Sequence, residues 1–216
     1  MAWGMKNIVI CIFGSSIMEG RIGVDDPQDR WYNVFQRLLS YAHPDTCFSI
    51  INSAVGGEST REVMSRFDRD ILPYNPDFCL FMAGGNNHDC QNPGRILAEG
   101  EFQILLDRFA ARLPEKTTPV GAVLNPVVDE WHFVTKHPTF RDYLVPFDGS
   151  LDASLNPERE FARSFYVRHD WPYLDLYALM SDNPVKYILP EDGIHMNKTG
   201  HAVFAREMFQ LVDSLL

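Results

Sequence analysis

Residues 8–17 read IVICIFGSSI: six apolar residues in a row, rich in isoleucine, followed at once by a glycine and two serines. A continuous apolar run of this length is typical of a strand that is buried on both faces of a parallel sheet. In α/β proteins the functional side chains lie in the loops that leave the carboxyl ends of such strands. The stretch therefore predicts a first buried strand over 8–13 and places Ser16 at the functional edge of a sheet.

Four more short apolar runs follow along the chain and alternate with amphipathic stretches. The runs are residues 47–51, 78–82, 120–124 and 173–176. Helical spacing of apolar residues, or a typical helix start, marks residues 31–39, 59–68, 102–113, 204–215 and the pair Asn156-Pro157. Strands and helices that alternate in this way form a parallel sheet with helices on both faces. We therefore expect a single α/β domain over residues 1–216.

Residues 126–155 interrupt this alternation. The segment is rich in proline and aromatic residues, among them Trp131 and Phe140, and shows no clear period. A segment of this length inside a compact domain is usually functional or mobile. Because it follows the fourth predicted strand, it should leave the same edge of the sheet as Ser16. We expect this aromatic-rich insertion to line a ligand pocket; the alternative is that it packs on the domain as additional core.

Length, composition and charge describe an ordinary globular chain. It has 216 residues, of which 45% are hydrophobic and 22% are charged, and this is enough for one full core. The net charge of −10 argues against nucleic acid and anionic membrane surfaces as main partners. No apolar run approaches the roughly 18 residues that a membrane helix needs.

The cysteines favour a reducing compartment. The chain has four of them, at positions 11, 47, 79 and 90, and no two have C-x-x-C spacing. Three fall inside apolar runs, where cysteine usually behaves as a small inert hydrophobe. The run at 8–13 is also shorter than the apolar region of a signal peptide, which is about 7–15 residues long. We therefore expect a cytoplasmic location.

Several polar residues that suit one kind of chemistry follow the predicted strands. Ser16 follows the first strand, and Asp192 precedes His195 by three residues, a spacing that can place a carboxylate against an imidazole. Gly57 and Asn86 lie in glycine-rich loops after the second and third strands. Acyl transfer needs a nucleophile, a base, a group that orients the base, and donors for an oxyanion. These five residues form a candidate set for that chemistry.

Two other patterns compete with this set. Asp129 and His132 repeat the Asp-x-x-His spacing, but no amphipathic helix follows them, so we rank them below the later pair. His88 and Asp89, together with Asp192, could supply metal ligands for phosphoester hydrolysis, although no H-E-x-x-H motif supports this alternative.

Four blocks, in this order, make most of the chain resemble the SGNH hydrolases, also called GDSL-type esterases and lipases. Residues 14–17, GSSI, resemble the family's Gly-Asp-Ser-Leu block, and residues 52–57, NSAVGG, resemble its second block. Residues 84–87, GGNN, resemble Gly-x-Asn-Asp, and residues 192–195, DGIH, resemble the last block. Each block alone is a weak signal, but four in the right order are a strong one.

The resemblance implies a role for each residue of the candidate set. It makes Ser16 the nucleophile, His195 the base and Asp192 the acid that orients the base. The backbone N–H groups of Ser16 and Gly57 and the side-chain amide of Asn86 would form the oxyanion hole. It further implies a three-layer α/β/α, flavodoxin-like domain with a parallel sheet of about five strands.

The implied activity is that of a serine esterase that cleaves acyl esters through an acyl-enzyme, without metal or organic cofactor. Small-molecule or carbohydrate esters with short acyl chains, acetylated sugars among them, are the expected substrates. Trp31 resembles a tryptophan that is common after the first block, and we expect Trp31, Trp131 and Phe140 to contact substrate. The alternative is a catalytically silent ligand-binding module on the same fold.

Three positions depart from the family's pattern: Ile17 stands where the family has leucine, and the other two lack a carboxylate. Ser15 and Asn87 stand where the family has aspartate. A nearby carboxylate would raise the pKa of His195. With both positions neutral, we expect His195 to act as a base at lower pH than it otherwise would.

Overall fold

The structure, a computed structural model, describes residues 5–87 and 89–216. Within these residues, five parallel strands form one sheet in the order β2-β1-β3-β4-β5. The strands are β1 (Lys6–Phe13), β2 (Thr46–Asn52), β3 (Phe78–Phe81), β4 (Thr118–Val123) and β5 (Tyr173–Asp175). This order is that of the flavodoxin-like sheet. The predicted fold class is confirmed, and every predicted strand is present to within two residues at each end.

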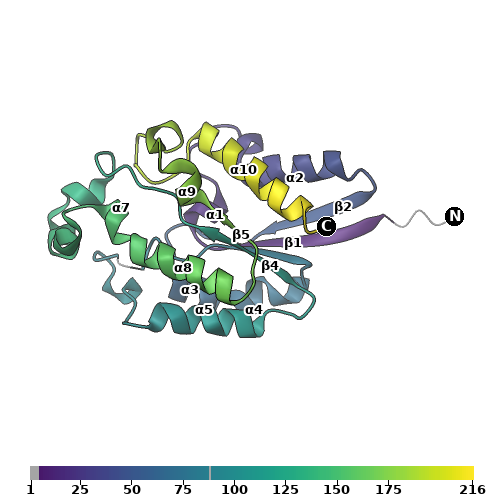
Figure 1. Ribbon diagram of the computed structural model, residues 1–216, viewed down its shortest axis with the longest axis horizontal. Coiled ribbons are helices and arrows are strands. Elements are labelled where there is room, and N and C mark those ends of the chain that lie inside the picture. Colours follow the sequence, from purple (N-terminus) through teal and green to yellow (C-terminus); the bar gives the residue numbers. More distant parts are fainter. Residues whose placement is uncertain (1–4, 88) are drawn as a thin grey trace.

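Helices cover both faces of the sheet (Figure 1). One face carries α2 (Trp31–Ala42) and α10 (Lys198–Asp213), which pack against each other. The other face carries α3 (Thr60–Ser65), α4 (Phe67–Asp70), α5 (Glu101–Arg112) and α8 (Asn156–Arg168). No helix in the described parts of the chain is long and apolar enough to cross a membrane.

The alternating side chains of β1 supply the cores on both faces. Ile8, Ile10 and Ile12 belong to the core beneath α2 and α10. Cys11 and Phe13 belong to the opposite core, which is dominated by phenylalanine rings. Successive residues of a strand point to opposite faces, so a strand buried on both sides must be apolar throughout. This is the physical reason for the continuous apolar run in the sequence.

The predicted helix over 59–68 is divided in two. Ser59 caps α3 as expected: its side chain accepts from the backbone N–H of Glu62, whose carboxylate accepts in turn from the N–H of Ser59. The helix is interrupted at Arg66, and α4 continues the chain to Asp70. The Arg66 guanidinium binds the carboxylates of Glu58 and Asp70 and the carbonyl oxygen of Ser53, so it joins both short helices to the loop before them.

The segment 126–155 is folded into short helical turns rather than an irregular loop. It contains α6 (Arg141–Leu144), α7 (Leu151–Ser154) and three 3₁₀ turns, at Phe133–Lys136, Pro138–Phe140 and Val145–Phe147. Leu144 and Leu151 are buried in the core beneath α2 and α10. The segment stands at the end of the molecule toward which β1 runs, away from the N-terminus (Figure 1). Part of it is therefore core, as the alternative interpretation held.

The remaining elements are short. They are α1 (Ser16–Glu19), α9 (Leu176–Met180) and 3₁₀ turns at Pro27–Asp29, Leu72–Tyr74, Pro93–Arg95 and Pro184–Lys186. The four cysteines, all within the described residues, form no disulfide bond with one another. Cys11 and Cys79 are buried in neighbouring strands, and burial raises the pKa of the Cys11 thiol to about 12, so it stays protonated. Cys47 differs from the expectation of a buried residue: it is exposed on β2, which is an edge strand.

Candidate active site

Ser16 is the first residue of α1, directly after β1. The chain turns at Gly14, whose φ is +147°. A Cβ added there would lie 2.7 Å from the carbonyl oxygen of Met82, so no larger residue fits without movement of the backbone. Met82 follows β3, the neighbouring strand. The turn therefore packs closely against the end of β3. This places Ser16, which is partly buried, at the carboxyl edge of the sheet.

The Asp192–His195 pair has the geometry that the spacing predicts. Oδ2 of Asp192 lies 2.7 Å from Nδ1 of His195. Oδ1 accepts from the backbone N–H groups of Ile194 and His195, at 3.0 and 2.9 Å. Burial alone would raise the pKa of Asp192, but these hydrogen bonds outweigh it, and the pKa lies below its usual value. An ionised Asp192 holds the proton of His195 on Nδ1 and leaves Nε2 free to accept another.

The loop that carries His195 is fastened to the end of β4. Nδ2 of Asn125 donates to the carbonyl oxygen of Ile194 at 2.9 Å. The backbone N–H of Leu189 donates to the carbonyl oxygen of His195 at 2.7 Å and closes the loop on itself. The imidazole is therefore placed by bonds on both sides of the loop, although the ring itself is only partly buried.

Two of the three expected oxyanion donors, Gly57 and Asn86, lie in loops that are hydrogen-bonded to each other. Nδ2 of Asn86 donates to the carbonyl oxygen of Glu58 at 3.1 Å, which uses one of the two amide hydrogens. Glu58 follows Gly57 directly, and its carboxylate binds Nε of Arg66 at 2.8 Å. Gly57 has a φ of +79° and open space where a Cβ would be. Among the described residues the second N–H of Asn86 has no partner, and Asn86 lines the pocket described below.

Asn87 ties the Asn86 loop to two helices. Its Oδ1 accepts from the backbone N–H of Thr60 at the start of α3, and its Nδ2 donates to Oε1 of Glu158 on α8, both at 2.8 Å. The other oxygen of Glu158 accepts from the backbone N–H of Gly85 at 3.0 Å. Burial raises the pKa of Glu158, and the bonds from Asn87 and Gly85 offset this only in part.

The expectation drawn from the two neutral positions stays a prediction, but the structure places an additional carboxyl group beside this loop. The aspartate of the family is replaced by Asn87, but a carboxylate from another element, that of Glu158, lies directly against the loop. Asn87 also has a structural role that needs both an acceptor and a donor, and an aspartate could supply only the acceptor.

A pocket of about 300 Å³ joins the catalytic candidates. Ser16, Gly57, Asn86 and His195 all line it. The insertion contributes a second group of lining residues, which are His132, Phe133, Val134, Phe140 and Leu151. The segment thus forms part of the pocket wall as well as part of the core. Phe140 lines the pocket as expected, whereas His132 and Phe133 were not among the residues predicted to contact substrate.

Two of the aromatic residues expected to contact substrate do not line this pocket. Trp31 is fully buried, stacks on Phe204 at a ring-centroid distance of 4.3 Å, and donates from Nε1 to the carbonyl oxygen of Met18. The prediction that Trp31 contacts substrate is therefore wrong. Trp31 is a core residue that is hydrogen-bonded to the backbone of α1. Trp131 is partly buried beside Gly193 and is absent from the pocket wall.

The repeated Asp-x-x-His pattern has no ion pair of its own. Asp129 accepts from the hydroxyl of Ser150 and from the backbone N–H groups of Leu151 and Asp152, so it binds the start of α7. The ring of His132 instead accepts from the N–H of Val134. The same spacing therefore gives a hydrogen-bonded Asp–His pair in one loop and two separate structural bonds in the other.

The residues proposed for a metal site are engaged elsewhere or lie outside the description. His88 lies outside the described residues. Asp89 accepts from Gln91 and Asn92, and Asp192 from His195. Over the described ranges, no three His, Cys, Asp or Glu side chains are grouped so that they could hold a metal ion.

Comparison with known proteins identifies the family of the chain. The sequence matches the GDSL-like lipase/acylhydrolase family over residues 12–203, and the chain belongs to that family. No curated protein matches the chain.

Solved structures share the fold at low identity. A lipase/acylhydrolase from Enterococcus faecalis has a TM-score of 0.75 and 17% identity, with 97% of each chain covered. An acetyl xylan esterase from Geobacillus stearothermophilus has a TM-score of 0.72 and 14% identity, covering 95% of this chain and 94% of that one. Another acetyl xylan esterase has a TM-score of 0.69 and 17% identity, covering 95% of this chain and all of that one.

The Asn87 network makes a prediction about stability. Asn87→Asp would place a second carboxylate against Glu158, so the pair must bind a proton in the folded state. The pKa of the shared proton is therefore raised in the folded state. The folded protein is stable while that proton is bound, at low pH, and it loses stability as pH rises through the raised pKa. We expect a loss of about 2 kcal/mol at pH 8, and less at pH 5, by thermal unfolding. Adding Glu158→Gln should restore stability; an Asn87→Asp protein as stable as the original at pH 8 would contradict the network.

Proposed function

We propose that this chain is a serine esterase that hydrolyses small acyl esters through an acyl-enzyme. One observation carries the proposal: Ser16, Gly57, Asn86 and His195 line a single pocket, and the His195 ring is hydrogen-bonded to Asp192. Family membership and esterase neighbours support an acylhydrolase of this kind. The assignment of individual residues rests on their chemistry and placement.

The reaction follows from these positions. His195 Nε2 takes the proton of Ser16 Oγ as the hydroxyl attacks the ester carbonyl, and Asp192 stabilises the resulting imidazolium. The N–H groups of Ser16, Gly57 and Asn86 donate to the oxyanion. His195 then gives its proton to the departing alcohol, and the same groups activate water to release the acid. No hydrogen bond joins Ser16 to His195 in this structure; such bonds often tighten only when substrate binds.

The substrate proposed is an ester of a short acyl group, with acetylated sugars as the leading class. A pocket of about 300 Å³ shared by acyl and alcohol parts suits a small ester. Two of the similar structures are acetyl xylan esterases, which supports an acetyl group on a carbohydrate. A cytoplasmic location, expected from the cysteine pattern, completes the proposal.

Labelling with a fluorophosphonate probe tests the serine mechanism directly. We expect stoichiometric labelling of the native protein, and none of the Ser16→Ala protein or of protein denatured beforehand. A native protein that is not labelled and hydrolyses no acetyl, butyryl or octanoyl ester would support the silent ligand-binding module instead. A screen of these chain lengths with a common alcohol then ranks the acyl groups.

Asn86→Ala should lower kcat more than it raises KM. The amide of Asn86 is needed chiefly when negative charge develops on the carbonyl oxygen, and loss of one such donor costs on the order of 10²–10³ in kcat. Steady-state kinetics on an acetyl ester measures both constants. A change in KM alone would reassign Asn86 to binding of the ground state.

A further inference from the structure

A second histidine lies in the wall of the active-site pocket. His132 is 8% exposed, lines the pocket together with His195, and belongs to the insertion rather than to any of the four family blocks. It is close enough to Asp192 and His195 to interact with both electrostatically. Burial is the main reason that the pKa of His132 is lowered, so the ring is neutral near pH 7. A neutral ring has one N–H donor.

The hydrogen bonds of His132 decide which nitrogen carries that proton. Nδ1 accepts from the backbone N–H of Val134 at 3.2 Å, so it has no proton of its own. The proton must then be on Nε2. Nε2 has no protein partner within the described residues, and it is not one of their buried unpaired polar atoms, which are Arg30 Nε and Asn125 Oδ1. Nε2–H is therefore an accessible donor on a ring that lines the pocket.

The position of His132 relative to the catalytic groups suggests which part of the ester it meets. Gly193, between Asp192 and His195, packs against it: a Cβ on Gly193 would lie 2.8 Å from the His132 backbone nitrogen. His132 is thus on the His195 side of the pocket, whereas two of the three proposed oxyanion donors are in the Gly57 and Asn86 loops. His195 protonates the departing alcohol, so the alcohol part of the ester must lie on this side.

An exposed aromatic ring accompanies the donor. Phe133 lines the same pocket, is 56% exposed, and stacks on the His132 ring at a centroid distance of 5.0 Å. An N–H donor beside an exposed aromatic face suits a ring that carries hydroxyl groups, because it offers a polar and an apolar contact together. A simple alkyl alcohol could use only the aromatic face.

We propose that His132 is a substrate-binding residue whose Nε2–H donates a hydrogen bond to a hydroxyl oxygen of the alcohol part, so that the enzyme prefers esters of sugars to esters of alkyl alcohols. The inference rests on the proposed esterase function and adds a residue that determines specificity. The expected readout is discrimination between alcohols, not overall rate.

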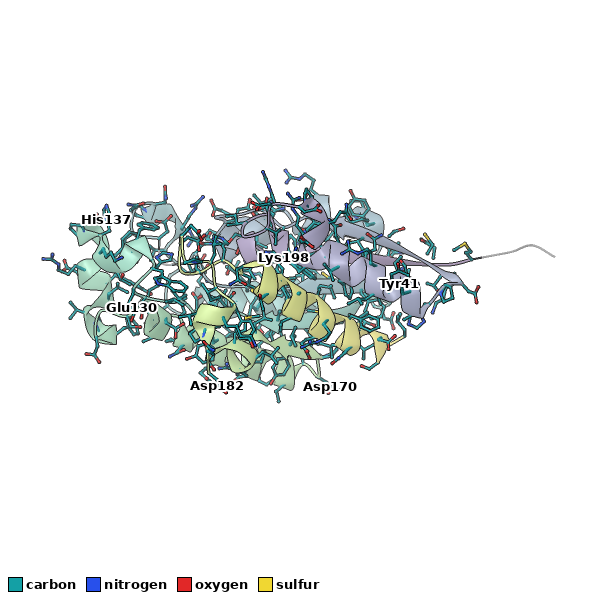
Figure 2. All side chains as sticks on the ribbon, turned by 90° about the horizontal axis from the view of Figure 1, so that it is seen from above. Tyr41, Glu130, His137, Asp170, Asp182 and Lys198 are labelled. Carbon is teal, nitrogen blue, oxygen red and sulfur yellow. The ribbon has the colours of Figure 1, made fainter. Side chains whose placement is uncertain are left out.

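The insertion contains a matched control. His137 has the same local structure: its Nδ1 accepts from the N–H of Thr139, two residues on, and it begins a 3₁₀ turn. However, His137 lines a different pocket, with Lys136 and Arg141, and it stands at the far end of the molecule (Figure 2). Asparagine can replace the Nδ1 acceptor at either position but has no equivalent of Nε2.

The test compares His132→Asn and His137→Asn on two acetyl esters, a monoacetylated methyl pentoside and cyclohexyl acetate. His132→Asn should lower kcat/KM for the pentoside on the order of tenfold and leave cyclohexyl acetate within about twofold. His137→Asn should change neither. Equal losses on both esters, or no loss on either, would overturn the proposal.

Two further measurements distinguish a failure of the His132 proposal from a failure of the esterase proposal. If the unaltered enzyme hydrolyses neither ester, or if Ser16→Ala still hydrolyses them, the esterase proposal itself fails. If His132→Asn does not fold, NMR of the Ser16→Ala protein replaces it. Adding the acetylated pentoside should then shift the imidazole resonances of His132 while those of His137 stay in place; unmoved His132 resonances would reject the contact.

Discussion

Ser16→Ala is expected to lower kcat for ester hydrolysis by a factor on the order of 10⁶ while leaving the fold intact. The proposed reaction begins with a bond from Ser16 Oγ to the acyl carbon, and alanine has no atom that could form it. A triad also acts as a unit, so the intact Asp192–His195 pair cannot compensate. The backbone conformation of Ser16, the first residue of α1, suits alanine, and its side chain is only partly buried.

The adjacent serine is the natural control for this variant. Ser15 precedes α1 and makes no capping hydrogen bond with its side chain. Ser15→Ala should therefore keep activity within a few-fold, although it alters the same turn. Circular dichroism and thermal unfolding check that both variants are folded. If a folded Ser16→Ala protein kept more than a few per cent of the activity, Ser16 would not be the nucleophile.

Asp192→Asn is expected to lower kcat on the order of 10⁴. An amide at this position can donate to Nδ1 of His195, which would move the imidazole proton to Nε2 and prevent that nitrogen from accepting the proton of Ser16. The carboxylate also accepts two backbone N–H groups in the same loop. The amide oxygen can keep those bonds, so we expect the loop to stay folded. The decrease in kcat/KM should come mainly from kcat and not from KM.

Asp129→Asn tests whether this loss is specific. The two aspartates share the Asp-x-x-His spacing, but Asp129 binds the start of α7 and not an imidazole. We expect Asp129→Asn to retain kcat within a few-fold and at most to lower the melting temperature. A loss of kcat in Asp129→Asn comparable with that in Asp192→Asn would show that the catalytic pair had been assigned to the wrong loop.

The direction of the Asp192 pKa shift also sets an expectation for pH dependence. Its folded pKa lies below its usual value, so the carboxylate stays ionised as pH falls from 8 to 5. A profile of kcat/KM against pH should therefore show no loss between pH 8 and pH 5 that comes from protonation of Asp192.

The fold could be predicted from the sequence because its strands are buried on both sides. Such strands must be apolar throughout, and the run at 8–13 shows this directly. The order of the candidate residues was also visible, because Ser16, Gly57 and Asn86 each follow a strand. Parallel strands end at one edge of the sheet, so residues far apart in sequence had to meet there.

Residue types alone could not distinguish core from site. Trp31 looked like a ligand contact, but packing on Phe204 removes it from solvent entirely. The replacement at Asn87 looked like the loss of a charge, but Glu158, 71 residues further along, brings a carboxylate to the same loop. Both outcomes depend on which helix covers which part of the sheet, and no local pattern encodes that.

The sequence by itself determined the parallel sheet, the candidate nucleophile and the Asp192–His195 pair, because these depend on continuous apolar runs and on spacings of a few residues. Only the tertiary structure decided what the equally spaced Asp129 and His132 do. There the carboxylate binds α7, and the imidazole lines the pocket with an Nε2 that no described residue binds. The partners of a side chain are set by long-range packing of whole elements, and a short sequence pattern specifies only those partners that lie within the same turn.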